Sequence, residues 1–386
     1  MAELYSLPDG WEWKTIEELC EILDRLRKPI SQKDRISGEY PYYGATGIVD
    51  YINNYIFDEK LLLIGEDGAK WGANENTAFI AEGKYWVNNH AHIMRPNKDL
   101  VIDSLLIYYL NTTDLMEYIT GATVKKLNQE KLKSINIPLP PLEEQKRIVA
   151  KLDILFEKID KAIALHQRNI DEADIFMESV LNDVFVELNG VYQKRQLDSF
   201  DKKMSSGGTP SRKEKLYWDN GTIDWFSSGE LNQLYTLPSK EKITQLGLEK
   251  TSTKLFSKGT LLIGMYDTAA MKMSILSNDG SCNQAIVGFK SDESELNILF
   301  LKYQLEYLKK DILEQRQGVR QQNLNLSKIK NIEIEYPPLK TQQKVVAYLD
   351  EISNKMEKIK QIQKEKMQSL KALKASILDK AFKGEL

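Results

Sequence analysis

The sequence predicts an α+β protein in which two α/β globular regions, with curved and mostly antiparallel sheets, are separated by two long antiparallel coiled-coil helices. The first observation behind this prediction is an internal repeat. Residues 127–153 (LNQEKLKSINIPLPPLEEQKRIVAKLD) align without gaps with residues 324–350 (LNLSKIKNIEIEYPPLKTQQKVVAYLD), which lie 197 positions later. The second is a long helical pattern after each copy. The third is that both preceding regions are rich in glycine, asparagine, tyrosine and short apolar runs.

The repeat divides the chain into four segments. Residues 1–139 and 191–336 form the two globular regions, and residues 140–190 and 337–386 form the two helical segments. In each half a short strand-like stretch leads into a Pro-Pro pair, and proline suits the first turn of a helix because no N–H donor is needed there. We therefore expect each half to run from a globule through a strand into a helix, with a pseudo-twofold relation between the halves.

Both helical segments carry apolar residues at steps of three, four or seven, which is the spacing of a narrow seam between two paired helices. The first segment is net acidic and the second net basic, so the two attract each other. We expect the helix-pair packing to involve Ile148, Leu152, Leu155, Ile159, Val345, Leu349, Ile352 and Met356.

Several elements of the globular regions are predicted from local pattern. Residues 60–64 and 260–263 are expected to be equivalent strands, each followed by glycine, and residues 86–94 and 282–289 are expected to be a second equivalent pair. Thr15 and Glu18 have the spacing of a capping box, so a short helix should begin there. Residues 105–109 and 299–308 are expected to be helical.

Composition excludes several classes of protein. The 386 residues hold 53 Lys and Arg against 56 Asp and Glu, a net charge of −3, so any nucleic-acid binding must rest on local clusters of positive charge. No apolar run approaches the ~18 residues of a membrane-spanning helix, and the first residues do not resemble a secretory signal. With only Cys20 and Cys282, a disulfide framework or a cysteine zinc site is not expected. The expected location is the cytoplasm.

Common catalytic motifs are missing from the sequence. There is no G-x-x-x-x-G-K-[ST] phosphate loop, no G-x-G-x-x-G after a strand, and no Asn/Asp-Pro-Pro-aromatic run. His90-x-His92 offers two imidazoles for a metal without an evident third ligand, so we expect polar residues on a strand instead. His166 falls in the helix seam and is expected to be a packing residue. We therefore predict no catalytic residues and no metal site.

Aromatic, amide and basic residues cluster in loop-like stretches of both globular regions. In the major groove of DNA, Arg reads guanine and Asn or Gln reads adenine, while Lys, Ser and Thr contact phosphates. The candidate DNA-binding residues are therefore Tyr42, Tyr43, Lys70, Asn89, His90, Lys125, Lys126, Asn128, Thr209, Ser211, Arg212, Lys213, Ser228, Asn283, Gln284, Arg316, Arg320, Gln321 and Gln322.

The chain resembles the specificity subunit of type I restriction-modification systems. The residues that carry the resemblance are LPDGWEW near the start, GGTPSR at 207–212, and two copies of PPLxxQxx[IV]VxxLD at 140–153 and 337–350. The resemblance implies that each globular region is a target-recognition domain for double-stranded DNA, and that each helical segment is a spacer that docks a methyltransferase subunit, two in all. Restriction and translocase subunits would join through the complex. S-adenosylmethionine, ATP and magnesium are then expected on the partners, with no cofactor in this chain.

A duplicated chain of this kind predicts a split target. Because the two globular regions differ in sequence, they should read different half-sites across a gap that neither reads. A helix of about 45 residues is roughly 65–70 Å long, on the order of 20 base pairs. Two alternatives remain open: a coiled-coil scaffold that binds proteins without a DNA role, and a self-contained nuclease.

Overall fold

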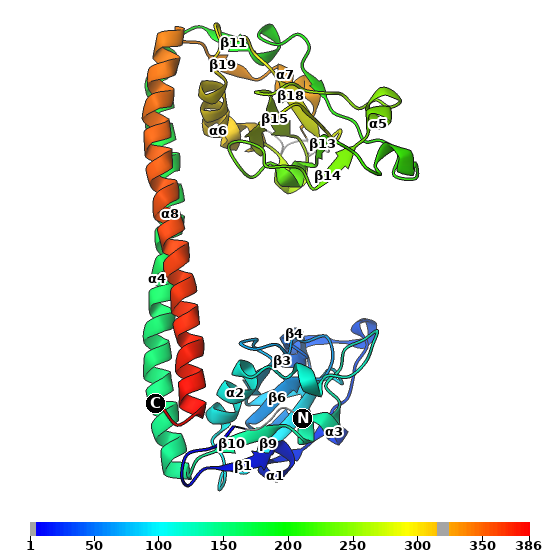
Figure 1. The fold of residues 1–386 in the computed structure, drawn as a ribbon, viewed down its shortest axis with the longest axis vertical. Coiled ribbons are helices and arrows are strands. Elements are labelled where there is room, and N and C mark those ends of the chain that lie inside the picture. The colour runs from blue at the N-terminus through cyan, green and yellow to red at the C-terminus, as the bar shows by residue number, and fades with distance from the viewer. Residues whose placement is uncertain (1–4, 315–323) are drawn as a thin grey trace. The chain divides into compact units, whose positions relative to one another are not determined.

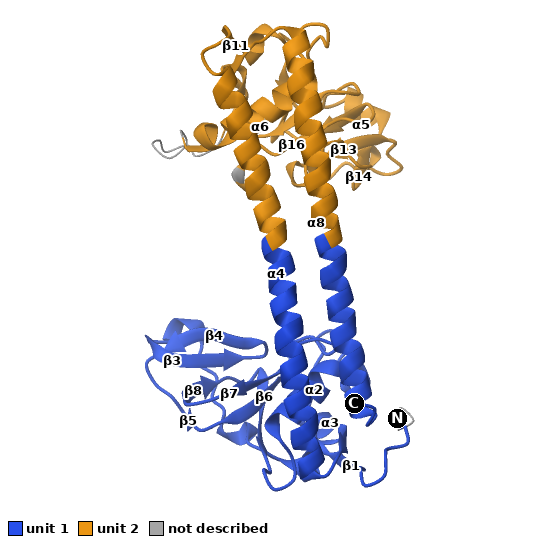
Figure 2. Cartoon of the chain, turned by 90° about the vertical axis from the view of Figure 1, so that its left-hand side faces the viewer, with its two compact units in different colours: residues 1–168, 363–386 blue, residues 169–362 orange. Residues whose placement is uncertain are grey.

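The computed structural model describes residues 5–314 and 324–386. The chain divides into two compact units, of which unit 1 comprises Met1–Arg168 with Gln363–Leu386, and unit 2 comprises Asn169–Ile362. Each unit therefore combines one globular region with a segment of both long helices, α4 (Leu142–Leu188) and α8 (Leu339–Phe382) (Figure 2). Within the described residues, no helix has the length and apolar character needed to cross a membrane.

Unit 1 is an α/β globule with short helices around two four-stranded sheets. The sheet orders are β2-β9-β6-β7 and β4-β3-β8-β5, and β1 pairs separately with β10. Its strands are β1 (Glu12–Thr15), β2 (Cys20–Ile22), β3 (Ser37–Gly44), β4 (Gly47–Ile52), β5 (Phe57–Asp58), β6 (Leu61–Gly65), β7 (Ala78–Ala81), β8 (Lys84–Val87), β9 (Ala91–Pro96) and β10 (Asn136–Leu139). Its helices before α4 are α1 (Ile16–Leu19), α2 (Asp103–Thr112) and α3 (Gln129–Lys133), with 3₁₀ turns η1 (Asp24–Leu26), η2 (Gln32–Asp34) and η3 (Met116–Tyr118).

Unit 2 repeats this plan. Its sheets have the orders β12-β18-β15-β16 and β14-β13-β17, and β11 pairs with β19. Its strands are β11 (Lys194–Gln196), β12 (Ser205–Ser206), β13 (Ile223–Phe226), β14 (Glu241–Ile243), β15 (Leu261–Gly264), β16 (Met273–Ile275), β17 (Gly280–Cys282), β18 (Ile286–Phe289) and β19 (Glu333–Glu335). Its helices are α5 (Gln245–Glu249), α6 (Ile298–Glu314) and α7 (Leu326–Lys330), with 3₁₀ turns η4 (Leu197–Ser199), η5 (Lys215–Tyr217), η6 (Ser228–Glu230) and η7 (Asp267–Ala269).

The predicted fold class is confirmed, and most strand pairs in both units are antiparallel. The exceptions correspond to each other, because β3 pairs in parallel with β8 in unit 1 and β13 pairs in parallel with β17 in unit 2. The strands predicted at 60–64 and 260–263 are β6 and β15, which lie inside the sheets (Figure 1). Their continuous apolar runs match this fully buried position.

One sequence prediction about the strands is wrong. Residues 86–94 and 282–289 are not single strands, because each range covers parts of two strands with a turn between them. The strands are β8 and β9 in unit 1, and β17 and the whole of β18 in unit 2. The interruption is a turn in which an asparagine side chain accepts a hydrogen bond from a backbone N–H two residues later, at Asn88 and at Asn283. Such turns compete with strand continuation even inside an apolar run.

The predicted short helices are present. Thr15 and Glu18 form the reciprocal capping box at the start of α1. The helices predicted at 105–109 and 299–308 correspond to α2 and α6, which are longer than predicted.

The long helices pack against each other and against the globules. In unit 1, Ile148, Leu152 and Ile159 of α4 share a buried core with Leu378 and Phe382 of α8 and with residues of α2. In unit 2, Leu349 belongs to the equivalent core, with Val345 and Ile352 packed against it. Leu155 packs against the unit 1 core, and Met356 is half-buried on α8. The predicted seam residues thus also join each helix to its globule.

Polar contacts between α4 and α8 run in opposite order along the two helices. In unit 1, Lys374 Nζ donates a hydrogen bond to the Asp160 carboxylate at 2.9 Å, and His166 Nδ1 lies 2.5 Å from Gln363 Oε1. In unit 2, Lys360 Nζ donates a hydrogen bond to the Asp174 carboxylate at 2.9 Å. Residue numbers rise along one helix as they fall along the other, so the two helices are antiparallel within each unit. His166 makes a polar contact in the seam rather than packing as an apolar residue would.

The repeated motif PPLxxQxx[IV]VxxLD forms the joint between globule and helix. Its glutamine, Gln145 or Gln342, is fully buried and hydrogen-bonds three backbone groups. Its aspartate accepts a hydrogen bond from a tyrosine of the globule, Tyr108 Oη to Asp153 at 2.5 Å in unit 1 and Tyr303 Oη to Asp350 at 2.6 Å in unit 2.

Candidate nucleic-acid interface

In unit 1, the β3–β4 hairpin tip, the end of β6 and the β8–β9 turn, which carries the candidates Asn89 and His90, meet at one edge. The tip of the β3–β4 hairpin reaches the end of β6, since a Cβ on Gly65 would lie 2.8 Å from the carbonyl oxygen of Ala45. The β8–β9 turn joins them through the Asn88 N–H, which donates to the Tyr43 carbonyl at 3.0 Å. This edge lies at the carboxyl ends of the parallel strands β3 and β8, where α/β proteins commonly bind ligands.

The segment that precedes α3 completes this edge. Leu127 N–H donates to the Glu66 carbonyl at 2.8 Å, which attaches the 120–128 segment to the end of β6. Lys70 and Lys125 consequently line one shallow pocket of about 470 Å³, together with Thr123 and two glycines. Two lysines, a hydroxyl and exposed backbone suit a phosphate group. The candidates Lys70 and Lys125 therefore lie together although they are 55 positions apart in the chain.

Unit 2 brings its own predicted clusters together in the same way. Asn283 N–H donates to the Phe226 carbonyl at 3.0 Å, so the β17–β18 turn adjoins residues 227–229, which include the candidate Ser228. Gly208 N–H donates to the Cys282 carbonyl at 2.9 Å, and Thr209 Oγ1 donates to Gln284 Oε1 at 2.5 Å. Glycine is required next to this contact, because a Cβ on Gly207 would lie 2.1 Å from the Cys282 carbonyl oxygen.

A buried charged network supports the unit 1 edge. Glu66 is bound by Arg27 and, at 2.5 Å, by Lys126. His92, which is fully buried, places Nδ1 2.6 Å from Asp24 and donates from Nε2 to the Leu127 carbonyl at 2.7 Å. The network thus ties η1, β6 and β9 to the segment that carries Lys125.

Hydrogen bonding sets the charge state of Asp24 in this network. Burial raises the pKa of Asp24, but hydrogen bonds from His92, Gln129 and the Ile93 N–H outweigh it, so the pKa lies below its usual value. Asp24, Glu66 and His92 have ligand atoms close enough for a metal ion. Arg27 and Lys126 already neutralise this acidic side, which disfavours a divalent cation there.

Unit 2 replaces this network with apolar packing. The same backbone hydrogen bond joins Leu324 N–H to the Met265 carbonyl at 3.2 Å, in place of Leu127 and Glu66. Sheet register also makes Val287 the equivalent of His92, since Ile263 faces Val287 and Ile64 faces His92. Counting back two residues from each of these positions makes Ala285 the equivalent of His90.

Three candidate residues have structural roles within the fold. Tyr42 is only 1% exposed, and its hydroxyl accepts a hydrogen bond from the Ile30 N–H at 2.8 Å, so it is a core residue. Tyr43 is half-buried and stacks on Phe79. Asn128 caps α3 through a hydrogen bond from the Lys131 N–H.

The Arg212 side chain is held by an ion pair and two aromatic contacts, so it is not free to contact DNA. Its guanidinium pairs with both carboxylate oxygens of Glu241 and lies over Trp218 and Trp225, 3.9 and 5.1 Å from the ring centroids. The hydrogen bonds from Arg212 keep the pKa of Glu241 below its ordinary value. A guanine contact by Arg212 would require this ion pair to open.

The remaining candidates divide by exposure. Ser228 is half-buried and begins η6. His90 is exposed and pairs with Asp67. The exposed side chains Asn89, Ser211, Lys213 and Gln284 project from the edges described above, while Asn283 is partly buried in its turn. Arg316, Arg320, Gln321 and Gln322 lie outside the described residues.

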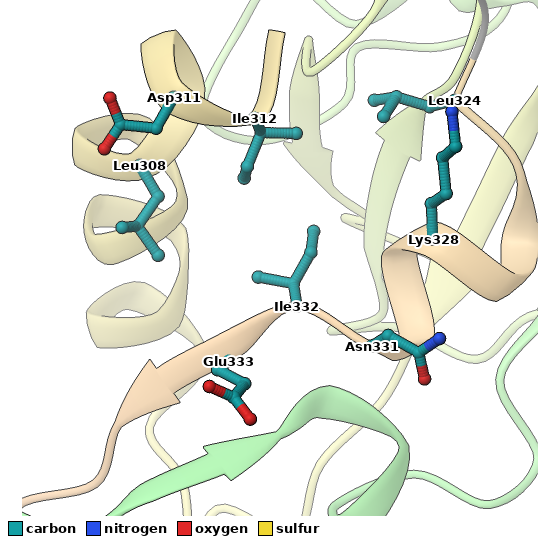
Figure 3. A pocket seen from close by; sticks show the side chains of 8 residues that line it. All are labelled: Leu308, Asp311, Ile312, Leu324, Lys328, Asn331, Ile332 and Glu333. Carbon is teal, nitrogen blue, oxygen red and sulfur yellow. The ribbon is translucent and has the colours of Figure 1, made fainter. Parts of the chain in front are cut away.

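Other features give no sign of chemistry in the described part of the chain. Cys20 and Cys282 are buried free thiols, and burial raises the pKa of each to about 12, which keeps both unreactive. A pocket of about 510 Å³ lies between α6 and the α7–β19 connection of unit 2. In Figure 3, Ile312 and Ile332 point into this pocket while the Asp311 carboxylate points away from it. The described residues that line it combine apolar side chains with Lys328, Asn331 and two carboxylates, and include no cysteine, serine or histidine.

Sequence reasoning missed the residues that hold these edges in place. Gln145 and Gln342 stand in the repeated motif, so repetition was an available signal for them. Asp24 and Glu66 gave no signal, because a buried acid cannot be told from an exposed one by its neighbours in the chain.

The fold and the paired edges define a duplicated recognition protein, with two related α/β heads on shared long helices. A family model described as "Type I restriction modification DNA specificity domain" matches residues 8–172 and again residues 190–366. The chain therefore belongs to the family of type I restriction-modification specificity subunits.

Individual relatives agree with this assignment. A putative type I restriction enzyme specificity subunit from Haemophilus influenzae is 30% identical over 360 residues, covering 88% of this chain and 86% of the relative. The EcoDI specificity subunit from Escherichia coli is 22% identical over 413 residues, covering 97% and 89%.

Solved structures share the fold. A chain from a study of complex assembly and conformational transition of the type I restriction-modification system aligns with a TM-score of 0.74 at 20% identity, covering 99% of this chain and 100% of that chain. The HsdS subunit from Thermoanaerobacter tengcongensis aligns with a TM-score of 0.51 at 20% identity, covering 100% and 99%.

Proposed function

We propose that this chain is the sequence-reading subunit of a type I restriction-modification complex, and that unit 1 and unit 2 each read one half of a bipartite, asymmetric DNA target. The observation that carries the proposal is the pair of equivalent edges at the ends of β3 and β8 and of β13 and β17. Equivalent backbone there carries different side chains, for example the exposed His90 in unit 1 and the buried Ala285 in unit 2. Two edges with the same backbone arrangement and different side chains suit two different half-sites.

In this proposal the two edges divide their contacts by chemistry. Lys70, Lys125 and Thr123 in unit 1, and exposed residues of the 209–213 stretch in unit 2, contact phosphates and set the position on the duplex. Exposed amides of the two turns contact base edges. This division predicts that the lysines govern salt dependence and the amides govern sequence preference.

Catalysis in this proposal belongs to partner subunits. A methyltransferase subunit would bring S-adenosylmethionine, and a restriction and translocase subunit would bring ATP and magnesium. The chain itself would hold no cofactor and would work in the cytoplasm, where the complex reaches the chromosome. Two buried, unreactive thiols and the absence of the common catalytic motifs from the sequence support this division of labour.

The long helices supply a docking surface that suits two copies of one partner. Leu165 on α4 and Ile362 on α8 occupy the same repeat position and are 57% and 43% exposed. Phe176 and Leu373 form a second such pair, 50% and 48% exposed. Large apolar side chains at equivalent exposed positions of both repeats are what two identical methyltransferase subunits would need.

The proposed spacer role is tested by shortening both helices together. The change removes 168–171 from α4 and 363–366 from α8, two stretches at the same level of the helix pair as judged from the Asp174–Lys360 contact, and it leaves both exposed apolar pairs in place. Four residues are about one turn, so the helix faces stay nearly aligned while each helix loses about 6 Å, roughly two base pairs. Modified-base sequencing of a host carrying the variant with its methyltransferase partner maps the methylated sites.

The expected result is the same two half-sites with a shorter unread gap. Altered half-site sequences with an unchanged gap would contradict the spacer role. A cut in α4 alone is the control, because it breaks the register of the helix pair and should abolish site-specific methylation.

A further inference from the structure

We infer that Asn89 in unit 1 and Gln284 in unit 2 are matched base-reading positions, and that each recognises an adenine in its half-site. The inference rests on the proposed function and names the residues and the base class for the two edges. Both residues lie in turns, Asn89 in the one that connects β8 to β9 and Gln284 in the one that connects β17 to β18.

The two turns are the same structure. The first residue, Asn88 or Asn283, donates its N–H to the end of the neighbouring parallel strand, at Tyr43 or Phe226, at 3.0 Å in both units. Its side-chain oxygen accepts from the N–H two residues later, at 2.8 and 3.0 Å.

The third residue of each turn links the turn to the chain just after the neighbouring strand. Its carbonyl accepts a hydrogen bond from the residue that follows β6 or β15, Glu66 N–H to His90 at 2.8 Å and Met265 N–H to Ala285 at 2.9 Å. The three matching hydrogen bonds all involve the first and third residues of each turn, so the middle residue takes no part in this shared framework.

That middle residue is an exposed amide in both units. Asn89 and Gln284 are exposed, while Asn88 is 6% exposed and Asn283 is partly buried, because the first residue must face inward to hold the turn. A carboxamide offers one acceptor and two donors, and adenine in the major groove offers the N7 acceptor beside the N6 donor. Asparagine and glutamine can therefore bind adenine with two hydrogen bonds, which no other base allows in the same geometry.

In unit 2, the proposed base-reading side chain, Gln284, is also held in place before DNA binds. Thr209 Oγ1 donates to Gln284 Oε1 at 2.5 Å, so the longer side chain is held by the 207–212 stretch. Restraint of a glutamine before binding reduces the conformational entropy lost on contact with a base. The carbonyl retains a second lone pair for the adenine N6 group, and the amide N–H remains for N7.

The test replaces each amide by its acid of equal shape. Asn89→Asp and Gln284→Glu keep the acceptor and remove the donor to adenine N7. Each variant, in complex with the methyltransferase partner, is used to select from a duplex library in which both half-sites are randomised. Asn54→Asp and Gln196→Glu are matched controls, since both positions are exposed and Asn54 uses only its side-chain oxygen, for the Tyr55 N–H.

The expected result is a loss of preference for adenine at one position of one half-site, about 5- to 150-fold. Asn89→Asp should affect only one half-site and Gln284→Glu only the other, while the controls leave both unchanged. Weaker binding to all sequences alike would make these residues phosphate neighbours and overturn the inference, as would unchanged selection or a shift at a guanine or pyrimidine. If the unmodified complex selects no split sequence, the proposed function fails instead.

Discussion

Gln145 and Gln342, which lie 197 positions apart, hold the starts of α4 and α8 by the same set of hydrogen bonds. Gln145 Oε1 accepts from the Ile102 N–H at 3.0 Å, and its Nε2 donates to the carbonyls of Leu100 and Pro140. Gln342 repeats this with the Asn297 N–H and the carbonyls of Glu295 and Pro337. Each glutamine satisfies backbone groups that are buried where globule and helix meet, so it fixes the direction in which the helix leaves its globule.

Loss of this amide should loosen one joint at a time. Gln145→Ala leaves three backbone groups unpaired and should lower the free energy of unfolding of unit 1 by about 2–4 kcal/mol. Hydrogen exchange measured by mass spectrometry should show faster exchange in α2 and the first turns of α4, with unit 2 unchanged. Gln342→Ala should give faster exchange in α6 and the first turns of α8, with unit 1 unchanged. Gln196→Ala, at an exposed position, serves as the control. Equal effects of either substitution on both units would contradict separate joints.

The tyrosine–aspartate pairs make the same joints sensitive to alkali. Burial, with a smaller effect of Asp153, raises the pKa of Tyr108 above its usual value, and burial and Asp350 do the same for Tyr303. A raised pKa means that the stability contributed is fully present below the unfolded-state pKa near 10 and is lost as pH rises through the folded-state value. Urea unfolding should therefore give constant stability from about pH 8 to 10 and a decline above it. Replacing both tyrosines, Tyr108→Phe with Tyr303→Phe, should reduce the decline, and an unchanged slope would show that other groups cause it.

Acid should affect unit 1 before unit 2. The folded-state pKa of Asp24 is lowered, so its contribution to stability is present above the unfolded-state value near 4 and is lost as pH falls through the folded-state value. Unit 2 has Met265 and Val287 in the corresponding core and lacks this contribution. Protection of β6 and β9 against hydrogen exchange should fall below about pH 4 while β15 and β18 stay protected. Asp24→Asn should make unit 1 less dependent on pH over this range, although less stable at neutral pH.

Much of this architecture could be predicted from the sequence because it repeats or because it is continuous. Within the predicted strands at 60–64 and 260–263, residues 61–64 and 261–263 are apolar throughout, as expected of strands buried on both faces, and these strands are β6 and β15. Side-chain partners distant in sequence could not be predicted. Arg212 has a residue type suited to reading guanine, but its partner Glu241 lies 29 positions away, and only the folded chain brings them together.

The contacts of Arg212 with Glu241 and Trp218 should stabilise the local structure rather than read a base. Arg212→Ala removes the ion pair to Glu241 and the contact with Trp218, so the 207–218 stretch should exchange its amide hydrogens faster even without DNA. Glu241→Gln should produce part of the same loosening, since it weakens the ion pair but leaves the guanidinium over the indole. If Arg212→Ala leaves exchange unchanged and alters one half-site position, the ion pair opens on DNA and Arg212 reads a base.

The exposed apolar pairs on the long helices should control how many methyltransferase subunits bind. Leu165→Asp places a charge on one of two equivalent docking positions, and Ile362→Asp places it on the other. Each single variant should bind one methyltransferase subunit where the unmodified chain binds two, and the double variant should bind none, because burial of an unpaired carboxylate is unfavourable. Native mass spectrometry of the purified complexes counts the subunits directly. Gln368→Glu, which adds a charge at another exposed position of α8, should leave two subunits bound. Two bound subunits in the double variant would move the docking surface away from this part of the helices.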